Sequence, residues 1–377
     1  MVARCETMRA ALVIIFLVVA GRALAQSECL QAATDTDAGP TTRIYDTGDV
    51  NGDGVPDVLA GYTELGAMGA TSTSWIVVAL GDGAAGFRML PPVEVDDRSS
   101  MAQLVDLNED GRDDVVAASY SDRRIVRWLA APDGTLRARR NVRVGQRVYD
   151  VGVGDYDGDG HMDVAATSLD GLRIFRGNGR GGLRRGQTLG EGRMPTIPMS
   201  ADFDGDGTRD LFVLHNDSAS GAAYRGARRF GPAMGFDACD SPYTPLVADV
   251  DRDGRPDVVY SCSNQGVRWY RNAGQMEMIE AGYLAEQARN PWISMGDIDG
   301  DGDDELVVTS EIGRHLLVLE RDAQGLFQER ARATFVAQSF FRPQIADFDG
   351  DGTLDIAVVA RDRTTNRFRV YSGRACR

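Results

Sequence analysis

The stretch Asp49-Val-Asn-Gly-Asp-Gly-Val-Pro-Asp57 decides the fold, because its pattern occurs seven times along the chain. Each copy reads D-x-[DN]-x-D-G-x-x-[DE], with oxygen-bearing side chains at positions 1, 3, 5 and 9 and glycine at position 6. This spacing can wrap a short loop around a hard cation, because four side chains and a backbone carbonyl near position 7 supply the six or more oxygens that Ca²⁺ takes. Glycine permits the sharp turn that converging carboxylates require. The repetition predicts up to seven calcium sites.

Each loop contributes four candidate calcium ligands. They are Asp49, Asn51, Asp53 and Asp57; Asp106, Asn108, Asp110 and Asp114; Asp155, Asp157, Asp159 and Asp163; Asp202, Asp204, Asp206 and Asp210; Asp249, Asp251, Asp253 and Asp257; Asp297, Asp299, Asp301 and Glu305; and Asp347, Asp349, Asp351 and Asp355. In the sixth loop Asp303 and Asp304 stand beside Glu305, so the sequence leaves open which carboxylate closes that site.

Two other interpretations of the loops fit less well. An EF-hand requires Glu at position 12 and flanking helices, but position 12 is Ala, Val or Tyr in every copy, and short β-prone apolar runs such as Leu306-Val-Val308 follow the loops. Asp-Gly pairs also make good turns without any metal. That alternative explains one aspartate in each loop, whereas four oxygen positions are kept in all seven.

The first 25 residues are typical of a secretory signal. Arg4 and Arg9 precede the apolar stretch Ala10 to Ala20, and Ala23-Leu-Ala25 is an A-x-A cleavage site. We therefore expect a soluble protein exported to the periplasm or the extracellular space, with residues 26–377 as a single domain. The apolar stretch is short for a membrane span, and no second one approaches spanning length.

The formal net charge of −15 has a specific origin, because the seven loops hold nearly half of the 56 acidic residues. Bound calcium would neutralise most of this charge. Such a balance argues against nucleic acid as a partner, since phosphate binding needs a basic surface. The chain also has no lysine, which excludes Schiff-base chemistry.

The loops recur about every 48 residues, at intervals of 57, 49, 47, 47, 48 and 50. In each period one short strand enters the loop, a second leaves it, a third follows a polar turn, as in Trp75 to Ala79, and a weaker fourth follows, as in Phe87 to Val95. Four short antiparallel strands per period predict an all-β fold, a seven-bladed β-propeller with the acidic loop between strands 1 and 2 of each blade.

The two ends of the chain complete each other in this layout. The seventh unit stops after three strands, so the segment after residue 26 can supply its fourth strand, starting at Cys29. Cys29 would then lie near Cys376, and we expect a disulfide between them. Cys239 and Cys262 fall on one face of the fifth blade and form a second expected pair. Free buried thiols remain the alternative.

The loop between two strands, followed by a glycine-rich turn, resembles the FG-GAP or VCBS repeat of integrin α chains and secreted bacterial proteins. The resemblance covers residues 41–377 and implies Ca²⁺ at positions 1, 3, 5 and 9 of the seven loops. The literal Phe-Gly…Gly-Ala-Pro signature is absent, apart from the fragment Phe230-Gly-Pro-Ala233. A structural role for calcium is favoured over catalysis, because like charges gathered without an ion oppose folding.

The resemblance also implies that partners dock on the face opposite the calcium loops. There the sequence places Tyr149, Arg193, Tyr243, Trp292, Phe341 and Arg342, with Tyr120, Arg123 and Arg124 from a turn between strands 2 and 3. Packing at the channel mouth is the competing explanation for each. We expect a monomeric binding or adhesion module for an extracellular protein or glycan, without catalytic residues. A calcium-dependent polysaccharide lyase or hydrolase is the alternative, although no nucleophile motif occurs and the three histidines are scattered.

Overall fold

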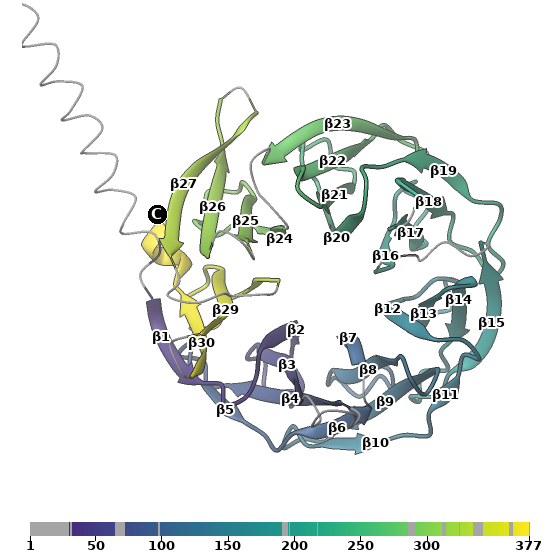
Figure 1. Ribbon diagram of the computed structural model, residues 1–377, viewed down its shortest axis with the longest axis horizontal. Coiled ribbons are helices and arrows are strands. Elements are labelled where there is room, and N and C mark those ends of the chain that lie inside the picture. The colour runs from purple at the N-terminus through teal and green to yellow at the C-terminus, as the bar shows by residue number, and fades with distance from the viewer. Residues whose placement is uncertain are drawn as a thin grey trace, which may run out of the picture.

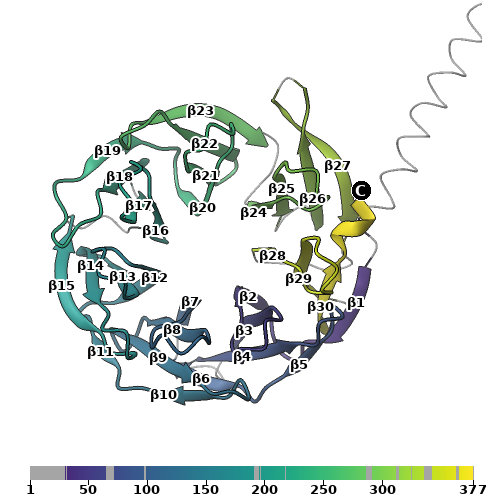
Figure 2. The same ribbon diagram turned by 180° about the vertical axis from the view of Figure 1, so that it is seen from behind.

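A computed structural model of the chain describes residues 30, 32–64, 72–96, 99–190, 195, 197–216, 218–285, 291–310, 314–323, 325–334, 342–361 and 365–376. Its seven antiparallel sheets stand around a central axis, as Figures 1 and 2 show from the two sides. This is the predicted seven-bladed propeller. The expected signal at residues 1–25 lies outside the described residues. Within the described part of the chain, no helix is long and apolar enough to cross a membrane.

The strands of each blade follow one another from the axis outward. The first three blades consist of β2 (Arg43–Gly48), β3 (Asp57–Glu64), β4 (Thr73–Gly81), β5 (Phe87–Met89) and β6 (Val93–Asp96); β7 (Ser99–Val105), β8 (Asp114–Ser119), β9 (Arg124–Ala130), β10 (Leu136–Ala138) and β11 (Val142–Arg143); and β12 (Val148–Gly154), β13 (Asp163–Ser168), β14 (Gly171–Arg176) and β15 (Arg184–Leu189).

The next three blades have the same order and, like the third blade, a single outer strand. They consist of β16 (Met199–Ala201), β17 (Asp210–His215), β18 (Ser220–Tyr224) and β19 (Met234–Asp237); β20 (Pro242–Ala248), β21 (Asp257–Cys262), β22 (Gly266–Asn272) and β23 (Met278–Ala285); and β24 (Pro291–Gly296), β25 (Glu305–Ser310), β26 (His315–Arg321) and β27 (Phe327–Thr334).

The seventh blade joins the two ends of the described chain. It consists of β28 (Gln344–Ala346), β29 (Asp355–Arg361), β30 (Asn366–Tyr371) and, as its outermost strand, β1 (Ala32–Asp37), which runs antiparallel to β30 with Asp35 opposite Arg369. The short 3-10 helix η1 (Gly373–Cys376) follows. Figure 1 shows β1 along the outer side of β30. Cys29 lies outside the described residues; Cys376 is disulfide-bonded.

The fourth strand of the first blade differs from the expectation. The sequence predicts one strand from Phe87 to Val95, but the structure has two short ones, β5 and β6, both paired with β4. Pro91 and Pro92 lie between them. Because proline has no backbone N–H to give to the ladder, the pair interrupts the strand.

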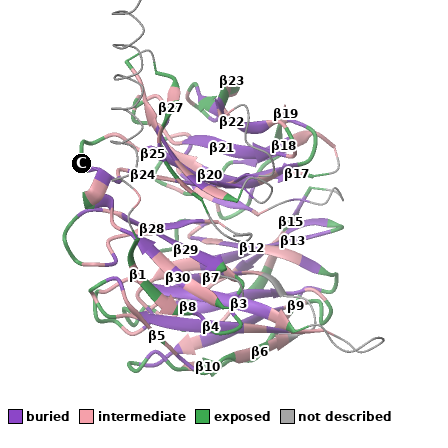
Figure 3. Cartoon of the chain, turned by 60° about the vertical axis from the view of Figure 1, so that its left-hand side comes forward, coloured by how far each residue is buried: buried purple, intermediate pink, exposed green. Residues whose placement is uncertain are grey.

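The hydrophobic core is a ring of contacts between neighbouring blades. Among the described residues it divides into seven clusters, and each combines side chains of two adjacent sheets. Strands β8, β13, β21 and β25 are buried along their whole length. A strand covered on both faces favours consecutive apolar residues instead of an alternating pattern, which explains the apolar runs that follow the acidic loops. Figure 3 shows this burial inside the ring.

The fifth blade contains the expected disulfide between Cys239 and Cys262, with the two Cα atoms 6.1 Å apart. It ties the link between β19 and β20 to the end of β21. Both cysteines are buried, with exposed fractions of 4% for Cys239 and 0% for Cys262.

Replacing both cysteines by alanine should lower the free energy of unfolding by about 3 kcal/mol, because a crosslink that spans 23 residues restricts the unfolded chain. Denaturant titration of the double variant against the wild-type protein measures this loss. The same titration under reducing conditions is the control, since reduction should remove the difference. A double variant as stable as the oxidised wild-type protein would contradict the expectation.

Candidate metal centres and a pocket between blades

Each acidic loop joins the first strand of a blade to the second, for example β2 to β3 and β24 to β25. All blades run outward from the axis with the same order of strands, so the seven loops lie on one face of the ring. The turns between strands 2 and 3 and the links between blades lie on the other face.

The first aspartate of each loop shapes the turn. Asp49 accepts hydrogen bonds from the backbone N–H groups of Gly52, Asp53 and Gly54, at 2.7, 3.1 and 2.8 Å. Asp155 and Asp202 bind the equivalent groups of their own loops. The two glycines have φ of +78° and +82° in the first loop, a region that side chains strain to adopt. Sequence and backbone therefore bend each loop around its carboxylates.

The ninth residue is the most buried member of each loop and connects three strands. Asp57 is fully buried; one oxygen accepts the N–H of Val50 at 2.8 Å, and the other accepts the N–H of Gly81, at the end of the third strand, at 2.9 Å. The same two bonds recur in five other loops, at Asp114, Asp163, Asp210, Asp257 and Asp355.

The sixth loop has glutamate at this position. Glu305 accepts the N–H of Ile298 at 2.8 Å, as the aspartates do. Its carboxylate lies with those of Asp297 and Asp299, and their oxygen atoms are within 4.8 Å of one another. The neighbouring Asp303 pairs instead with Arg252 of the fifth loop. Of the alternatives that the sequence leaves open, the structure brings Glu305 into the carboxylate cluster.

Burial makes these carboxylates difficult to ionise without a cation. Desolvation raises the pKa of Asp57, Asp163, Asp210, Asp257 and Asp355 to about 6. It raises the pKa of Asp114 and Glu305 to about 7. Neighbouring loop carboxylates act in the same direction, for example Asp49 and Asp53 on Asp57. A bound cation would oppose both effects and lower the pKa values of these carboxylates.

The loops fit a calcium ion in two respects. In the third to seventh loops, three carboxylate oxygens from three residues lie within 4.8 Å of one another. In addition, the side-chain oxygens Oδ1 of Asn108, Asp157 and Asp251 and Oε1 of Glu305 are buried and have no hydrogen-bond partner in the described structure. Buried oxygens of this kind are costly unless a donor or a cation satisfies them. The residues that would hold the ion are those at positions 1, 3, 5 and 9.

The charge of the residue at loop position 3 corresponds to the kind of residue at the end of the third strand of the same blade. In blades three to five Asp157, Asp204 and Asp251 pair with Arg176, Arg225 and Arg271. In blades one and two position 3 is the neutral Asn51 or Asn108, and Leu80 or Leu129 stands where the arginine would be.

The sixth and seventh blades depart from this arrangement. In the sixth blade the residue at the end of the third strand is Glu320, and Arg330 of β27 bridges Asp299 and Glu320. In the seventh, Ser372 donates to Asp349 at 3.5 Å. In four blades, therefore, the carboxylate at position 3, which is absent from the loops with asparagine, is accompanied by an arginine side chain.

The ion pair between Asp157 and Arg176 in the third blade can be tested by mutation. Replacing Arg176 by leucine should lower the unfolding free energy of the calcium-free protein by about 2 kcal/mol, because Asp157 is then buried without its cation. The double variant Asp157→Asn/Arg176→Leu copies the second blade and should recover most of the loss. Chemical denaturation in the presence of chelator measures both. Equal losses in the single and double variants would show that the pair does not act as a unit.

The predicted ligand face contains two aromatic groups. Tyr120 and Tyr149 lie edge to face with ring centres 5.4 Å apart, and the guanidinium of Arg147 lies 5.0 Å from the Tyr120 ring. Tyr243 and Trp292 lie 6.2 Å apart on neighbouring blades.

The remaining predicted residues are dispersed. Arg342 lies near Asp46, and the pKa of Asp46 is raised to about 6 by burial although Arg342 opposes the shift. Arg123 lies in the turn before the third strand of the second blade, and Arg124 is the first residue of that strand. Arg193 and Phe341 lie outside the described residues.

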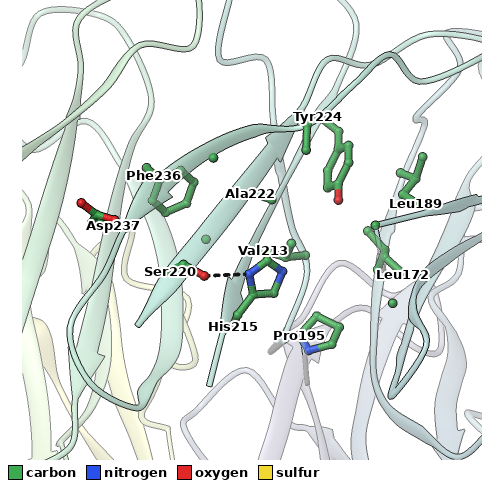
Figure 4. A pocket seen from close by; sticks show the side chains of 15 residues that line it. Leu172, Leu189, Pro195, Val213, His215, Ser220, Ala222, Tyr224, Phe236 and Asp237 are labelled. Atoms are coloured by element: carbon green, nitrogen blue, oxygen red, sulfur yellow. Dashed lines mark hydrogen bonds between the residues drawn. The ribbon is translucent and has the colours of Figure 1, made fainter. Parts of the chain in front are cut away.

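A pocket of about 570 Å³ lies between the third and fourth blades (Figure 4). Leu172 and Leu189 form one side and Val213 and Ala222 the other, with Tyr224 at one end. His215 and Ser220 meet at 3.2 Å where β17 turns into β18, so the pocket reaches the face opposite the acidic loops. Such a mainly apolar cavity with a few polar groups suits a small neutral ligand.

Sequence reasoning missed this pocket, although a signal existed. At the position of Ala222 the other blades carry Val77, Val126, Arg173, Arg268, Leu317 and Arg369, as the register of the second and third strands shows. The fourth blade therefore has the smallest side chain at this position. A comparison of the seven third strands would have indicated the missing volume.

The repeat itself identifies the protein's class, a β-propeller built from acidic-loop blades. The sequence profile described as "FG-GAP-like repeat" matches five overlapping segments, residues 106–166, 155–213, 202–260, 249–308 and 297–358. Together they cover about two thirds of the chain, and the chain belongs to the FG-GAP-like repeat family.

Solved structures of similar fold have diverse functions. An Agrocybe aegerita lectin that recognises non-reducing terminal N-acetylglucosamine is 19% identical, with a TM-score of 0.54, over 78% of this chain and 81% of its own. Saccharomyces cerevisiae Sqt1 is 12% identical, with a TM-score of 0.57, over 91% and 88%. Staphylococcus aureus virginiamycin B lyase is 14% identical, with a TM-score of 0.56, over 90% and 98%. These likenesses concern the fold alone. No curated protein sequence matches the chain.

Proposed function

We propose that this protein is an exported calcium-binding propeller that serves as a binding module for a protein or carbohydrate ligand. Up to seven Ca²⁺ ions would each hold the first hairpin of one blade and neutralise its carboxylates. The ions would act as structural elements, and the opposite face would be left for the ligand.

The observation that carries the calcium proposal is one buried side-chain oxygen on each of four loop residues that has no hydrogen-bond partner among the described residues. The four residues are Asn108, Asp157, Asp251 and Glu305. Each belongs to a loop whose first carboxylate is already turned inward by backbone N–H groups. Oxygen ligands of this number and type are those that calcium takes in proteins. Calorimetric titration of chelator-treated protein with Ca²⁺ tests it, with several bound ions per chain as the expected result and no binding heat as the contradictory one.

The ligand-binding part of the proposal is supported by the aromatic groups Tyr120–Tyr149 and Tyr243–Trp292 and by the pocket between blades three and four. Rigid aromatic rings and enclosed cavities are common features of binding surfaces. A glycan array and a pull-down from extracellular extract, both with calcium-loaded protein, provide the test. Glycans with terminal N-acetylglucosamine belong in the array because the lectin of similar fold recognises that sugar. The absence of binding in both the glycan array and the pull-down would contradict a binding function.

A further inference from the structure

The outer edge of the second blade carries an unusual concentration of positive charge for an acidic protein. Its outer strand is divided into β10 and β11, and both pair with β9. At this division a pocket of about 640 Å³ is lined by Arg124, Ala138, Arg139, Arg140, Asn141 and Arg143. Four of its six lining residues are arginines, in a chain whose formal net charge is −15.

Two of these arginines face each other directly. Arg143 of β11 is the register partner of Arg124 of β9, and residues opposite each other in an antiparallel pair project on the same side of the sheet. Like charges in this relation destabilise the pair unless an anion lies between them. Arg139, Arg140 and Arg143 are exposed, and none of the four arginines forms an ion pair with any other described residue. By contrast, Arg176, Arg225 and Arg271 are all paired with loop aspartates.

A buried arginine fixes the backbone beneath the pocket. Arg127 of β9 is only 5% exposed, and its guanidinium donates to the carbonyl oxygen of Arg140 at 2.7 Å and to that of Gly181 in the third blade. The backbone N–H of Arg139 in turn donates to the carbonyl oxygen of Arg127 at 2.9 Å. The backbone of the arginine-bearing segment is therefore held by the core of the blade, which fixes the positions from which these arginines project.

The chemistry of the lining selects the ligand class. Guanidinium groups bind carboxylate, sulfate and phosphate through two parallel hydrogen bonds. The lining contains no aromatic ring, so it offers no surface on which nucleic-acid bases could stack. A chain of sugars that carries separate anionic groups needs no stacking surface, and each of its groups can bind to the guanidinium of an arginine.

We propose that this arginine pocket binds the carboxylate or sulfate groups of an acidic polysaccharide. The inference rests on the proposed function as a binding module and names one class of ligand and its site. The polysaccharide would lie along the outer edge of the second blade, with one anionic group between Arg124 and Arg143 and a neighbouring one at Arg139 and Arg140.

Binding to immobilised polysaccharides by the calcium-loaded protein tests this proposal. The probes are alginate for carboxylates, dextran sulfate for sulfates, neutral dextran as the uncharged control and single-stranded poly-dT for nucleic acid. The triple variant Arg139→Gln/Arg140→Gln/Arg143→Gln should bind alginate or dextran sulfate about tenfold more weakly or worse. Added sodium chloride should weaken wild-type binding, because the contacts are exposed and charged.

The matched control is Arg88→Gln/Arg229→Gln/Arg314→Gln, which removes three exposed arginines from other blades. It should change the affinity by less than about twofold, and thermal melts should show both triple variants folded. Equal affinities of the two variants would overturn the proposal, and so would poly-dT binding that depends on the same three arginines. A wild-type protein that binds a neutral glycan or a protein but neither acidic polysaccharide would overturn this inference alone. Failure to bind any ligand would overturn the proposed function as well.

Discussion

Removal of calcium should lower the melting temperature of this protein by about 10 °C. Extracellular calcium sites typically bind in the range of about 10⁻⁴–10⁻³ M, so each occupied loop contributes on the order of 1 kcal/mol at millimolar Ca²⁺. Seven loops together approach the total stability of an ordinary domain, and a chain of this length converts that loss into a shift of about this size. Differential scanning calorimetry with Ca²⁺ and with EDTA measures it.

The calcium-free protein should also show an unusual dependence on pH. Its position-9 carboxylates have folded pKa values of about 6 to 7, above those of an unfolded chain. A raised folded pKa means that stability is present at low pH and is lost as the pH rises through that value. Melting temperatures in EDTA should therefore fall between about pH 4 and pH 7, from the unfolded to the folded pKa, and the gain on adding Ca²⁺ should grow over the same interval.

Magnesium is the control for these measurements, because it demands a smaller and more regular octahedral site and should restore little stability. The calcium-loaded protein, whose carboxylates are neutralised by the ion, should not lose stability over this pH interval. An EDTA-treated protein that melts at the same temperature as the calcium-loaded one would refute the calcium proposal altogether.

The features that the sequence predicted well are those that occur in all seven copies of the repeat. The loop pattern determines where strand 1 ends and strand 2 begins, and the apolar runs after it, such as Val258-Val-Tyr260, mark strands buried on both faces. The disulfide of Cys239 and Cys262 followed from placing the two residues on one face of the same blade. Repetition made these inferences possible, because an accidental pattern would not recur at a constant interval.

The features that sequence did not predict depend on how side chains of different strands meet. Arg176 is 19 residues from Asp157, and only the register of β13 and β14 shows that the two can pair. Arg143 opposite Arg124 is likewise a consequence of a divided outer strand whose second part pairs with β9. Single departures from a repeat carry little signal by themselves, whereas the same departures become informative once the blades are aligned by their hydrogen bonds.

The last residue of each loop should matter more to folding than the other ligands, even without calcium. Asp210 is fully buried, and its two oxygens accept backbone N–H groups of Phe203, at 2.9 Å, and Gly226, at 2.7 Å. Alanine at this position leaves two buried donors unsatisfied and removes the connection between the loop and the third strand. We expect a loss of about 3–5 kcal/mol in unfolding free energy, measured by denaturant titration in EDTA.

Asp206→Ala is the matched control in the same loop. Asp206 is exposed, and in the described structure its carboxylate accepts one local backbone bond, from Thr208 at 2.8 Å, so its loss should cost about 1 kcal/mol or less in EDTA. If the loop binds calcium as proposed, both variants also lose an ion ligand when calcium is present, and the gap between them should persist. Equal costs in EDTA would mean that the ninth residue acts only as a metal ligand. A persistent gap would instead mean that the buried carboxylate helps to build the blade before any ion binds.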